Sequence, residues 1–303
     1  MSKTWKKLIS VGCATCLLVS CIPETGIVLA AETGVEVQSE EAATSGTWGT
    51  CEWNLDEDGV LTISGGVGES VSWDSNPWGT IMGNITKVEI TGKISFEENN
   101  ISLAGLFESC KNLKEIQGLE KLDTSQVTDM SWMFSKCYSL EELDVSGFDT
   151  GNVTNMSYMF DSCDKLTNLN INGFDTSNVT NMWEMFSECY SLEELDVSGF
   201  DTSSVTDMGA MFWGCSSLEE LDVSGFDTSN VTSMFAMFEI CSSLEELDVS
   251  GFDTSNVTDM GAMFSRCSSL KKLDVSGFNT SQVTNVSSMF DNCSNLKELD
   301  LRN

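Results

Sequence analysis

The chain has 303 residues, of which 47 are Asp or Glu and 15 are Lys or Arg, so its formal net charge at neutral pH is −32. It contains no histidine, which excludes histidine-based catalytic triads and histidine-ligated metal sites. So acidic a chain is repelled by phosphate backbones and anionic lipid surfaces, and we expect no nucleic-acid partner and no peripheral membrane binding. Cationic partners or metal ions fit this charge better.

Residues 1–30 have the features of an export signal, in which three lysines precede an apolar run from Leu8 to Val19. This run is too short to span a bilayer. Two processing sites compete. Val28–Ala30 is typical of signal peptidase cleavage, whereas Leu18–Cys21 resembles a lipobox and would place a lipid on Cys21. We favour cleavage after Ala30. We expect an extracellular or cell-surface protein that reaches the membrane only through a lipid anchor on Cys21.

Residues 31–45 are acidic and small, which is typical of a flexible linker. Residues 46–100 differ from this linker, because their sequence has the pattern of β-strands. The run Thr47–Leu55 alternates apolar and polar residues, a turn follows, and Val60–Ser64 completes a predicted hairpin. A further strand is expected over Lys87–Ile90. We interpret this segment as a small β-rich capping module, with a carbohydrate-binding platform as the alternative role of its tryptophans, Trp48, Trp53, Trp73 and Trp78.

The segment 101–303 repeats itself with a period of 26 residues. The clearest marker is a phenylalanine at positions 134, 160, 186, 212, 238, 264 and 290, each followed three residues later by a cysteine. A looser first copy contains Phe107 and Cys110. A fixed period of this length is typical of a solenoid, in which each unit packs on its neighbours. We therefore expect about seven to eight stacked units.

Each unit combines two periodicities. The apolar positions from Met130 to Cys137 are spaced i, i+3, i+4 and i+7, which predicts a short helix. The run Leu140–Val145 switches to a period of two, which predicts a strand, and Gly147 marks the following turn. The predicted fold is an α/β solenoid of the leucine-rich-repeat type, with a parallel β-sheet on one face and short helices on the other.

The strand motif L-x-x-L-x-V resembles the leucine-rich-repeat signature. The full unit, FSECYSLEELDVSGFDTSSVTDMGAM from Phe186, resembles the repeat of BspA-like leucine-rich-repeat surface proteins of bacteria. The segment TWGTCEWNLDEDGVLTISG, with Pro77 and Trp78 downstream, resembles the module that often precedes such repeats. The resemblance covers nearly all of the chain after residue 46. It implies a secreted or cell-surface protein, some of whose relatives adhere to host proteins such as fibronectin and fibrinogen, and it implies no catalytic residue.

The cysteine of each unit lies on the apolar stripe, and we interpret it as a small buried side chain. Disulfides between units are the alternative, but they need Cα atoms within about 7 Å, whereas packed helix axes are about 8 to 10 Å apart. The repeats contain no C-x-x-C pair to bind a metal. We expect no cofactor.

An aspartate recurs at one position of the predicted strands. If the strands stack about 4.8 Å apart, adjacent carboxylates repel one another. A solvated acidic face is the simpler interpretation. A Ca²⁺ site is the alternative, with the candidate ligands Asp144, Asp196, Asp222, Asp248 and Asp274.

Positions that vary between units are more informative about a partner. Several of them hold large aromatic residues where other units have Gly, Ala or Ser. Aromatic residues are enriched in binding hot spots, although packing between neighbouring units is an equally simple explanation. The candidate binding residues are Trp132, Tyr158, Trp183, Trp213 and Phe235.

Three functions remain open. The protein binds a host or bacterial surface protein or glycan, or it is a structural surface component without a specific ligand, or it is an enzyme that uses a carboxylate pair as glycosidases do. Almost every acidic residue of the repeats recurs with the period, which argues against a unique catalytic pair. We favour a monomeric binding protein without enzymatic activity.

Overall fold

The structure is a computed structural model that describes residues 44–72 and 75–300. The predicted export signal, both of its processing sites, Cys21, most of the predicted linker and Trp73 lie outside these residues. The described residues belong to one compact unit, Ala42–Asn303. No helix within them is long and apolar enough to cross a membrane.

The N-terminal part begins with the predicted hairpin. Strand β2 (Cys51–Leu55) pairs antiparallel with β1 (Ser45–Trp48) on one side and with β3 (Val60–Ile63) on the other. The turn between β2 and β3 is closed by Asp56, whose Oδ1 accepts the backbone N–H of Val60 at 2.8 Å. The predicted hairpin is therefore confirmed between β2 and β3, but the run Thr47–Leu55 is not one strand, because a turn at Gly49 and Thr50 divides it between β1 and β2.

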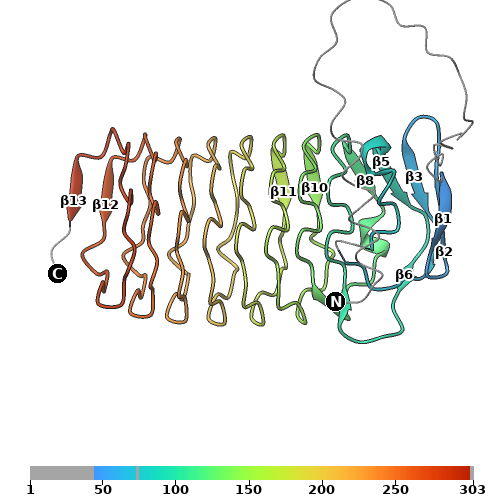
Figure 1. Cartoon of the computed structure of the whole chain (residues 1–303), viewed down its shortest axis with the longest axis horizontal. Helices are drawn as coiled ribbons and strands as arrows, with labels where there is room; N and C mark the ends of the chain where they lie inside the picture. Colours follow the sequence, from blue (N-terminus) through green and yellow to red (C-terminus); the bar gives the residue numbers. More distant parts are fainter. Residues whose placement is uncertain (1–43, 73–74, 301–303) are drawn as a thin grey trace, which may run out of the picture. The chain divides into compact units, whose positions relative to one another are not determined.

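From β3 onward the strands pair in parallel. Strand β5 (Lys87–Ile90) pairs with β3 and β8 (Glu115–Gln117) pairs with β5, which gives a five-stranded sheet of order β1-β2-β3-β5-β8 (Figure 1). Parallel stacking thus begins upstream of the 26-residue repeat. The other elements here are β4 (Gly66–Val67), β6 (Ile94–Ser95), β7 (Ile101–Ser102), β9 (Val127–Asp129) and two 3-10 turns, η1 (Met82–Asn84) and η2 (Leu119–Lys121).

Each repeat forms one coil of a β-solenoid, and successive coils are joined by parallel pairing (Figure 1). One row of bridges links residues 26 apart from Asp129 to Asn285. A second row lies at the predicted strand motif, where β10 pairs with β11 and β12 with β13. The parallel sheet is confirmed at these coils. Their bounds are β10 (Glu142–Asp144), β11 (Asn168–Asn170), β12 (Lys272–Asp274) and β13 (Glu298–Asp300).

The predicted helices are wrong. Met130–Cys137 and its equivalents, named turn segments below, form consecutive tight turns, and the only helical segments of the described residues are η1 and η2. Trp132 and Lys136 have left-handed φ values of 61°. The backbone N–H of Trp132 donates to the carbonyl of Ser157 in the next coil at 3.0 Å, whereas an α-helix would bond it four residues back. Consecutive turns direct apolar side chains inward at the same spacing as a helix. The apolar pattern therefore could not distinguish a helix from consecutive turns.

Phenylalanine side chains form a continuous column through the core. Neighbouring rings from Phe107 to Phe290 have centroids 5.6 to 5.8 Å apart and lie nearly parallel. Trp78 continues the column 5.6 Å from Phe107, and Trp48 packs edge-on against Trp78 at 5.9 Å. These tryptophans cover the N-terminal end of the apolar column, as expected of a cap.

The repeat cysteines form a second buried column, and the described cysteines are all free. The Sγ of Cys137 donates to the carbonyl of Phe107 in the preceding coil at 3.3 Å, and the later repeat cysteines make the equivalent bond. Burial raises the pKa of Cys215 to about 12, so this thiol stays a neutral donor. The interpretation as a buried side chain is confirmed, with a hydrogen bond added to its packing role.

Candidate functional site

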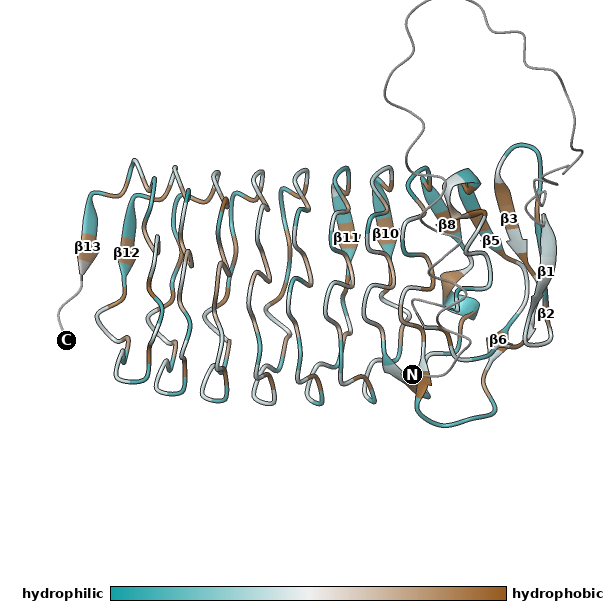
Figure 2. Ribbon diagram, in the orientation of Figure 1, coloured by the Kyte–Doolittle hydropathy of each residue, from teal (hydrophilic) through white to brown (hydrophobic). Residues whose placement is uncertain are grey.

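The strand face is formed by the motif L-x-x-L-x-V of successive coils. In β10 and β12 two exposed polar residues flank a buried leucine, and Figure 2 shows hydrophilic and hydrophobic residues in these strands. Asp222 Oδ1 accepts the backbone N–H of Ser224 at 3.0 Å and its hydroxyl at 2.6 Å. These bonds lower the pKa of Asp222 despite repulsion from the neighbouring aspartates. Equivalent hydrogen bonds close the turn in other coils. They join the serine two residues later to Asp144, Asp196 and Asp248, and the backbone N–H of Ser276 to Asp274.

Grooves follow this strand face. One, of about 1010 Å³, is lined by residues of three neighbouring coils, among them Glu219, Asp222, Glu246 and Lys272. Another, of about 720 Å³, lies near β8, β10 and β11. No group of three or more Cys, Asp and Glu in the described residues is placed to hold a metal ion. The aspartate column has a structural role in closing turns, and a Ca²⁺ role for it stays a prediction.

The turn face, formed by the turn segments of successive coils, holds all five predicted aromatic residues. Trp132 and Tyr158 stack with ring centroids 3.7 Å apart at 14°. Trp183 and Phe235 lie parallel at 6.4 Å although they are two coils apart. Gly209 occupies the same position in the coil between them, where a Cβ would lie 2.1 Å from Cζ3 of Trp183. The structure therefore brings four of the candidates together as two pairs.

Trp213 belongs to another column of the turn face. Its indole N–H is buried and has no hydrogen-bond partner. The hydroxyl of Ser187, at the same position one coil earlier, is likewise buried and without a partner. The two coils are joined at this point, since the carbonyl of Trp213 accepts the N–H of Glu188 at 2.6 Å. Trp213 is thus separate from the aromatic pairs and lies beside an unsatisfied hydroxyl.

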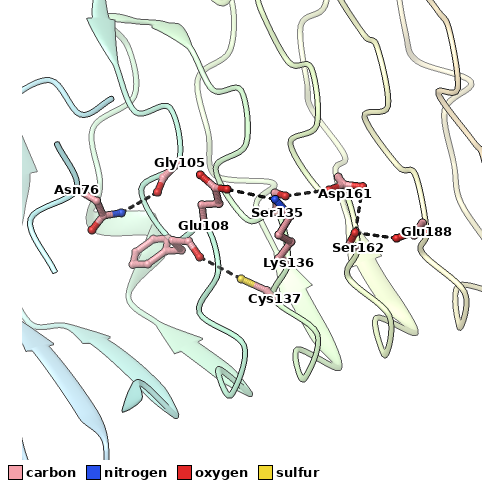
Figure 3. Close-up of polar contacts among 10 residues, drawn as sticks. Asn76, Gly105, Glu108, Ser135, Lys136, Cys137, Asp161, Ser162 and Glu188 are labelled. Atoms are coloured by element: carbon pink, nitrogen blue, oxygen red, sulfur yellow. Dashed lines mark hydrogen bonds and ion pairs between the residues drawn. The ribbon is translucent and has the colours of Figure 1, made fainter. Parts of the chain in front are cut away.

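On the turn face, carboxylates of neighbouring coils are linked by serine hydroxyls (Figure 3). Asp161, only 6% exposed, accepts hydrogen bonds from the hydroxyls of Ser135 at 3.0 Å and Ser162 at 3.1 Å. The Ser162 hydroxyl also lies 3.0 Å from Glu188 Oε2, so one proton serves two carboxylates. The other oxygen of Glu188 accepts the Tyr190 hydroxyl at 2.8 Å.

Two further carboxylates belong to this network. Glu184 Oε1 accepts the indole N–H of Trp183 at 2.7 Å, and Asp164 lies within electrostatic range of Glu188. Burial raises the pKa of Asp161, of Asp164 and of Glu184, and repulsion from Glu188 adds to each shift. The charged forms of these groups are therefore poorly compensated. We call Asp161, Asp164, Glu184 and Glu188 the acid cluster.

The acid cluster was not predicted from the sequence, because the acidic residues of the repeats were taken together as periodic. Glu184, Glu188 and Asp164 are each the only acidic residue at their position among the 26-residue units. Asp161 shares its position with acidic residues of two later units. The available signal was the coincidence of three such exceptions beside Asp161 in two adjacent coils, which shows only when the units are aligned and neighbouring columns are compared.

The arrangement offers two kinds of contact to a ligand. Ionised carboxylates accept strong hydrogen bonds from hydroxyl, ammonium or guanidinium donors. Aromatic faces beside them attract apolar or cationic groups. Trp132, Tyr158 and Trp183 are partly exposed, Tyr190 is 39% exposed and Phe235 is 37% exposed. The turn face can therefore bind a ligand that combines donors with an apolar or cationic surface.

Several solved structures are similar to this chain. Similar solved structures include a leucine-rich repeat protein from Eubacterium ventriosum (18% identity, 86% of each chain covered, TM-score 0.32) and one from Bacteroides ovatus (15% identity, 82% of this chain and 92% of that chain, TM-score 0.31). A third is a leucine rich cell surface protein from Faecalibacterium prausnitzii (16% identity, 86% of this chain and 95% of that chain, TM-score 0.26).

No curated protein matches the sequence. A family described as "Mycoplasma protein of unknown function, DUF285" matches residues 101–220 and 191–302. These two matches overlap and together span the repeat region, which is more than half of the chain. The chain therefore belongs to the DUF285 family of repeat proteins.

Proposed function

We propose that this chain is an exported surface protein whose repeat stack binds a protein or a glycan through the turn face. The observation on which this rests is that the side chains that break the repeat gather on that face. Two aromatic pairs and the acid cluster lie there, on coils that are otherwise nearly identical. Specific recognition requires such differences, because a perfectly regular surface offers the same contacts at every coil.

The regular columns have structural explanations. The phenylalanine, cysteine and strand aspartate columns recur in coil after coil and form core packing, buried hydrogen bonds and closed turns. A structural surface component would need only these columns. The poorly compensated carboxylates and the exposed rings do not add to the stability of the free protein. They therefore favour a binding role over a purely structural one. The proposal assigns no catalysis to the chain.

The export part of the proposal rests on residues 1–30, which predict secretion. Mass spectrometry of the mature protein tests it. A chain that begins at Ala31 indicates release, and a lipid on Cys21 indicates anchoring. A mature protein that retains Met1 and residues 1–30 would contradict export.

The binding part is tested by probing the protein against arrays of glycans and of host and bacterial surface proteins. The informative variant is Trp132→Ala/Trp183→Ala/Phe235→Ala, which removes both aromatic pairs. The control is Val286→Ala/Leu299→Ala, which removes exposed apolar side chains of the last described coil, 54% and 37% exposed. We expect a ligand whose affinity falls at least about tenfold in the first variant and stays unchanged in the second.

Other outcomes contradict the proposal in different ways. A ligand that the aromatic variant binds as well as the natural protein would move the binding surface away from the turn face. An array without any ligand would favour the structural alternative.

A further inference from the structure

We infer that the acid cluster is a receptor for a basic side chain, lysine or arginine, that a protein partner presents to the turn face. This inference rests on the proposed function and deepens it by naming the chemistry of the ligand. It follows from four features of the cluster: its uncompensated charge, a shortage of donors, an unpartnered buried hydroxyl, and the way in which the chain's own lysine sits beside it.

The first feature is charge. Five ion pairs join the described residues, and none of them includes a member of the acid cluster. Lys136 acts on Asp161 electrostatically, but its ammonium forms its ion pair with Glu108, with Nζ 3.4 Å from Oε1. Carboxylates held close together in a partly buried place repel one another unless a cation joins them. A basic side chain would supply that cation.

The second feature is the count of donors. The Ser162 hydroxyl has one proton and lies within hydrogen-bond distance of both Asp161 and Glu188. The remaining donors to the cluster are single groups: the hydroxyls of Ser135, Tyr158 and Tyr190, the indole of Trp183 and the backbone N–H of Asp164. Each ionised carboxylate accepts about four hydrogen bonds, whereas an ammonium offers three donors and a guanidinium five. The cluster therefore has acceptors that a basic side chain can fill.

The third feature is the hydroxyl of Ser187, which is fully buried and has no partner. It occupies the same column as Ser135 and Asp161. Side chains of this column point along the stack, since the Ser135 hydroxyl bonds Asp161 one coil on and the Ser265 hydroxyl bonds Glu239 one coil back. The N–H of Ser162 also donates to the carbonyl of Ser187 at 2.8 Å. The unpartnered hydroxyl thus lies in this column between Asp161 one coil back and Trp213 one coil on.

The fourth feature is Lys136, which shows how a basic group fits this face (Figure 3). Its ammonium lies between the Glu108 carboxylate and the ring of Trp132, 5.1 Å from the ring centroid. One coil later the lysine position is Ser162, and two coils later it is Glu188. Over these two coils carboxylates and aromatic rings continue while the cation does not, and the next basic residue at this position is Arg266. A lysine or arginine from a partner would repeat the arrangement that Lys136 makes.

The ring faces favour a basic side chain over a bare metal ion. Tyr158, Trp183 and Tyr190 flank the carboxylates, and aromatic rings attract ammonium and guanidinium groups. Ca²⁺ needs six to eight oxygen ligands around one point. The described residues contain no acidic group of three placed to hold such an ion.

The test uses three short peptides, Ac-Gly-Lys-Gly-NH₂, Ac-Gly-Arg-Gly-NH₂ and the uncharged Ac-Gly-norleucine-Gly-NH₂. Each is titrated into isotope-labelled protein up to about 50 mM, a range that detects Kd values near 1 mM and above. The readout is the indole N–H resonances of Trp132 and Trp183, assigned by Trp→Phe variants. We expect saturable shifts with the lysine or arginine peptide and none with the norleucine peptide.

Two variants with equal charge changes locate the site. Asp161→Asn/Glu184→Gln/Glu188→Gln removes three charges from the acid cluster. Asp222→Asn/Glu219→Gln/Glu245→Gln removes three from the strand face. We expect the first to weaken peptide binding at least about tenfold and the second to change it less than about twofold. A melting curve of each variant checks that it is folded, so a loss of binding cannot be a loss of structure.

The inference is overturned if the norleucine peptide shifts the same resonances equally, or if both triple variants weaken binding to the same extent. It is also overturned if CaCl₂ causes the same shifts at lower concentration than either basic peptide, or if no peptide causes a shift. One result would contradict the basic ligand and not the proposed function. If a neutral glycan binds through the aromatic pairs, the protein has a binding role but its ligand is not a basic side chain.

Discussion

At the residue scale, Gly209 shows how one small residue shapes the turn face. Its position is held by Trp183 one coil earlier and by Phe235 one coil later, and the two rings lie parallel at 6.4 Å across it. A Cβ at Gly209 would lie 2.1 Å from the Trp183 ring. Only a residue without Cβ lets the two rings approach each other over the coil between them.

We therefore predict that Gly209→Ala displaces the Trp183 ring toward solvent. The displaced ring should give red-shifted tryptophan emission and lose its contact with Phe235, at a stability loss of about 1 kcal/mol for a broken aromatic pair. Gly225→Ala is the matched control, because a methyl group added there would have the carbonyl oxygen of Ser198 as its nearest neighbour, 4.0 Å away. Equal emission spectra for both variants would show that Gly209 does not position the ring.

At the element scale, the turn segment decides between two structures with the same apolar pattern. Ala236 has a φ of 53°, in the left-handed region that costs a residue with a Cβ about 1 kcal/mol and costs glycine nothing. In a helix, an Ala to Gly change would instead destabilise by about 1 kcal/mol. The two structures therefore predict effects of opposite sign for one substitution.

We predict that Ala236→Gly leaves the stability unchanged or raises it by up to about 1 kcal/mol, measured as the shift of the urea unfolding midpoint. Part of the gain is offset by the greater freedom of glycine in the unfolded chain. The control is Ala104→Gly, a buried alanine of the first copy without a positive φ, which should destabilise. A loss of about 1 kcal/mol at position 236 would speak for a helix there.

The turn segment also shows how much of the fold can be predicted from the sequence. The period, the inward columns and the parallel strand motif follow from apolar spacing, because stacking must bury Phe134 and its equivalents in register. The backbone structure of the turn segment does not follow from apolar spacing. Its backbone bonds run to the next coil, as from Phe134 to Met159, and a single unit contains no information about its neighbour's carbonyls. Local periodicity therefore predicts which residues are buried better than it predicts their secondary structure.

The site was predictable in part for a related reason. The aromatic candidates Trp132 and Trp183 stand out as large residues at positions that are small elsewhere. The acid cluster does not stand out along the chain, because Asp161 and Glu184 are 23 residues apart and the structure places them on adjacent coils. Their proximity is a property of the stack.

At the scale of the whole molecule, two classes of carboxylate act on stability in opposite directions with pH. Asp144, Asp196, Asp222 and Asp248 have pKa values lowered by hydrogen bonds from the serine two residues later. Their contribution to stability is present above the pKa of the unfolded chain and is lost as the pH falls through the folded value.

The acid cluster behaves in the reverse way. Asp161 and Glu184 have pKa values raised chiefly by burial, so their ionised forms destabilise the folded state. This destabilisation is relieved as the pH falls through their folded pKa values, which are raised above those of the unfolded chain. Acidification from neutral pH therefore first protonates Asp161 and Glu184 and only later breaks the turns closed by the strand aspartates.

We predict that the urea midpoint of the natural protein rises as the pH falls from about 7 toward about 5, and then falls as the pH is lowered further. Asp161→Asn/Glu184→Gln should lose part of the rise and keep the later fall, because it removes only the carboxylates whose ionised forms are buried. Glu219→Gln/Glu245→Gln removes two exposed charges from the strand face and controls for the relief of general repulsion in so acidic a chain. If both variants reduce the rise equally, general repulsion explains it. A larger reduction in the first variant would show that the acid cluster stores the unfavourable charge that a basic ligand can neutralise.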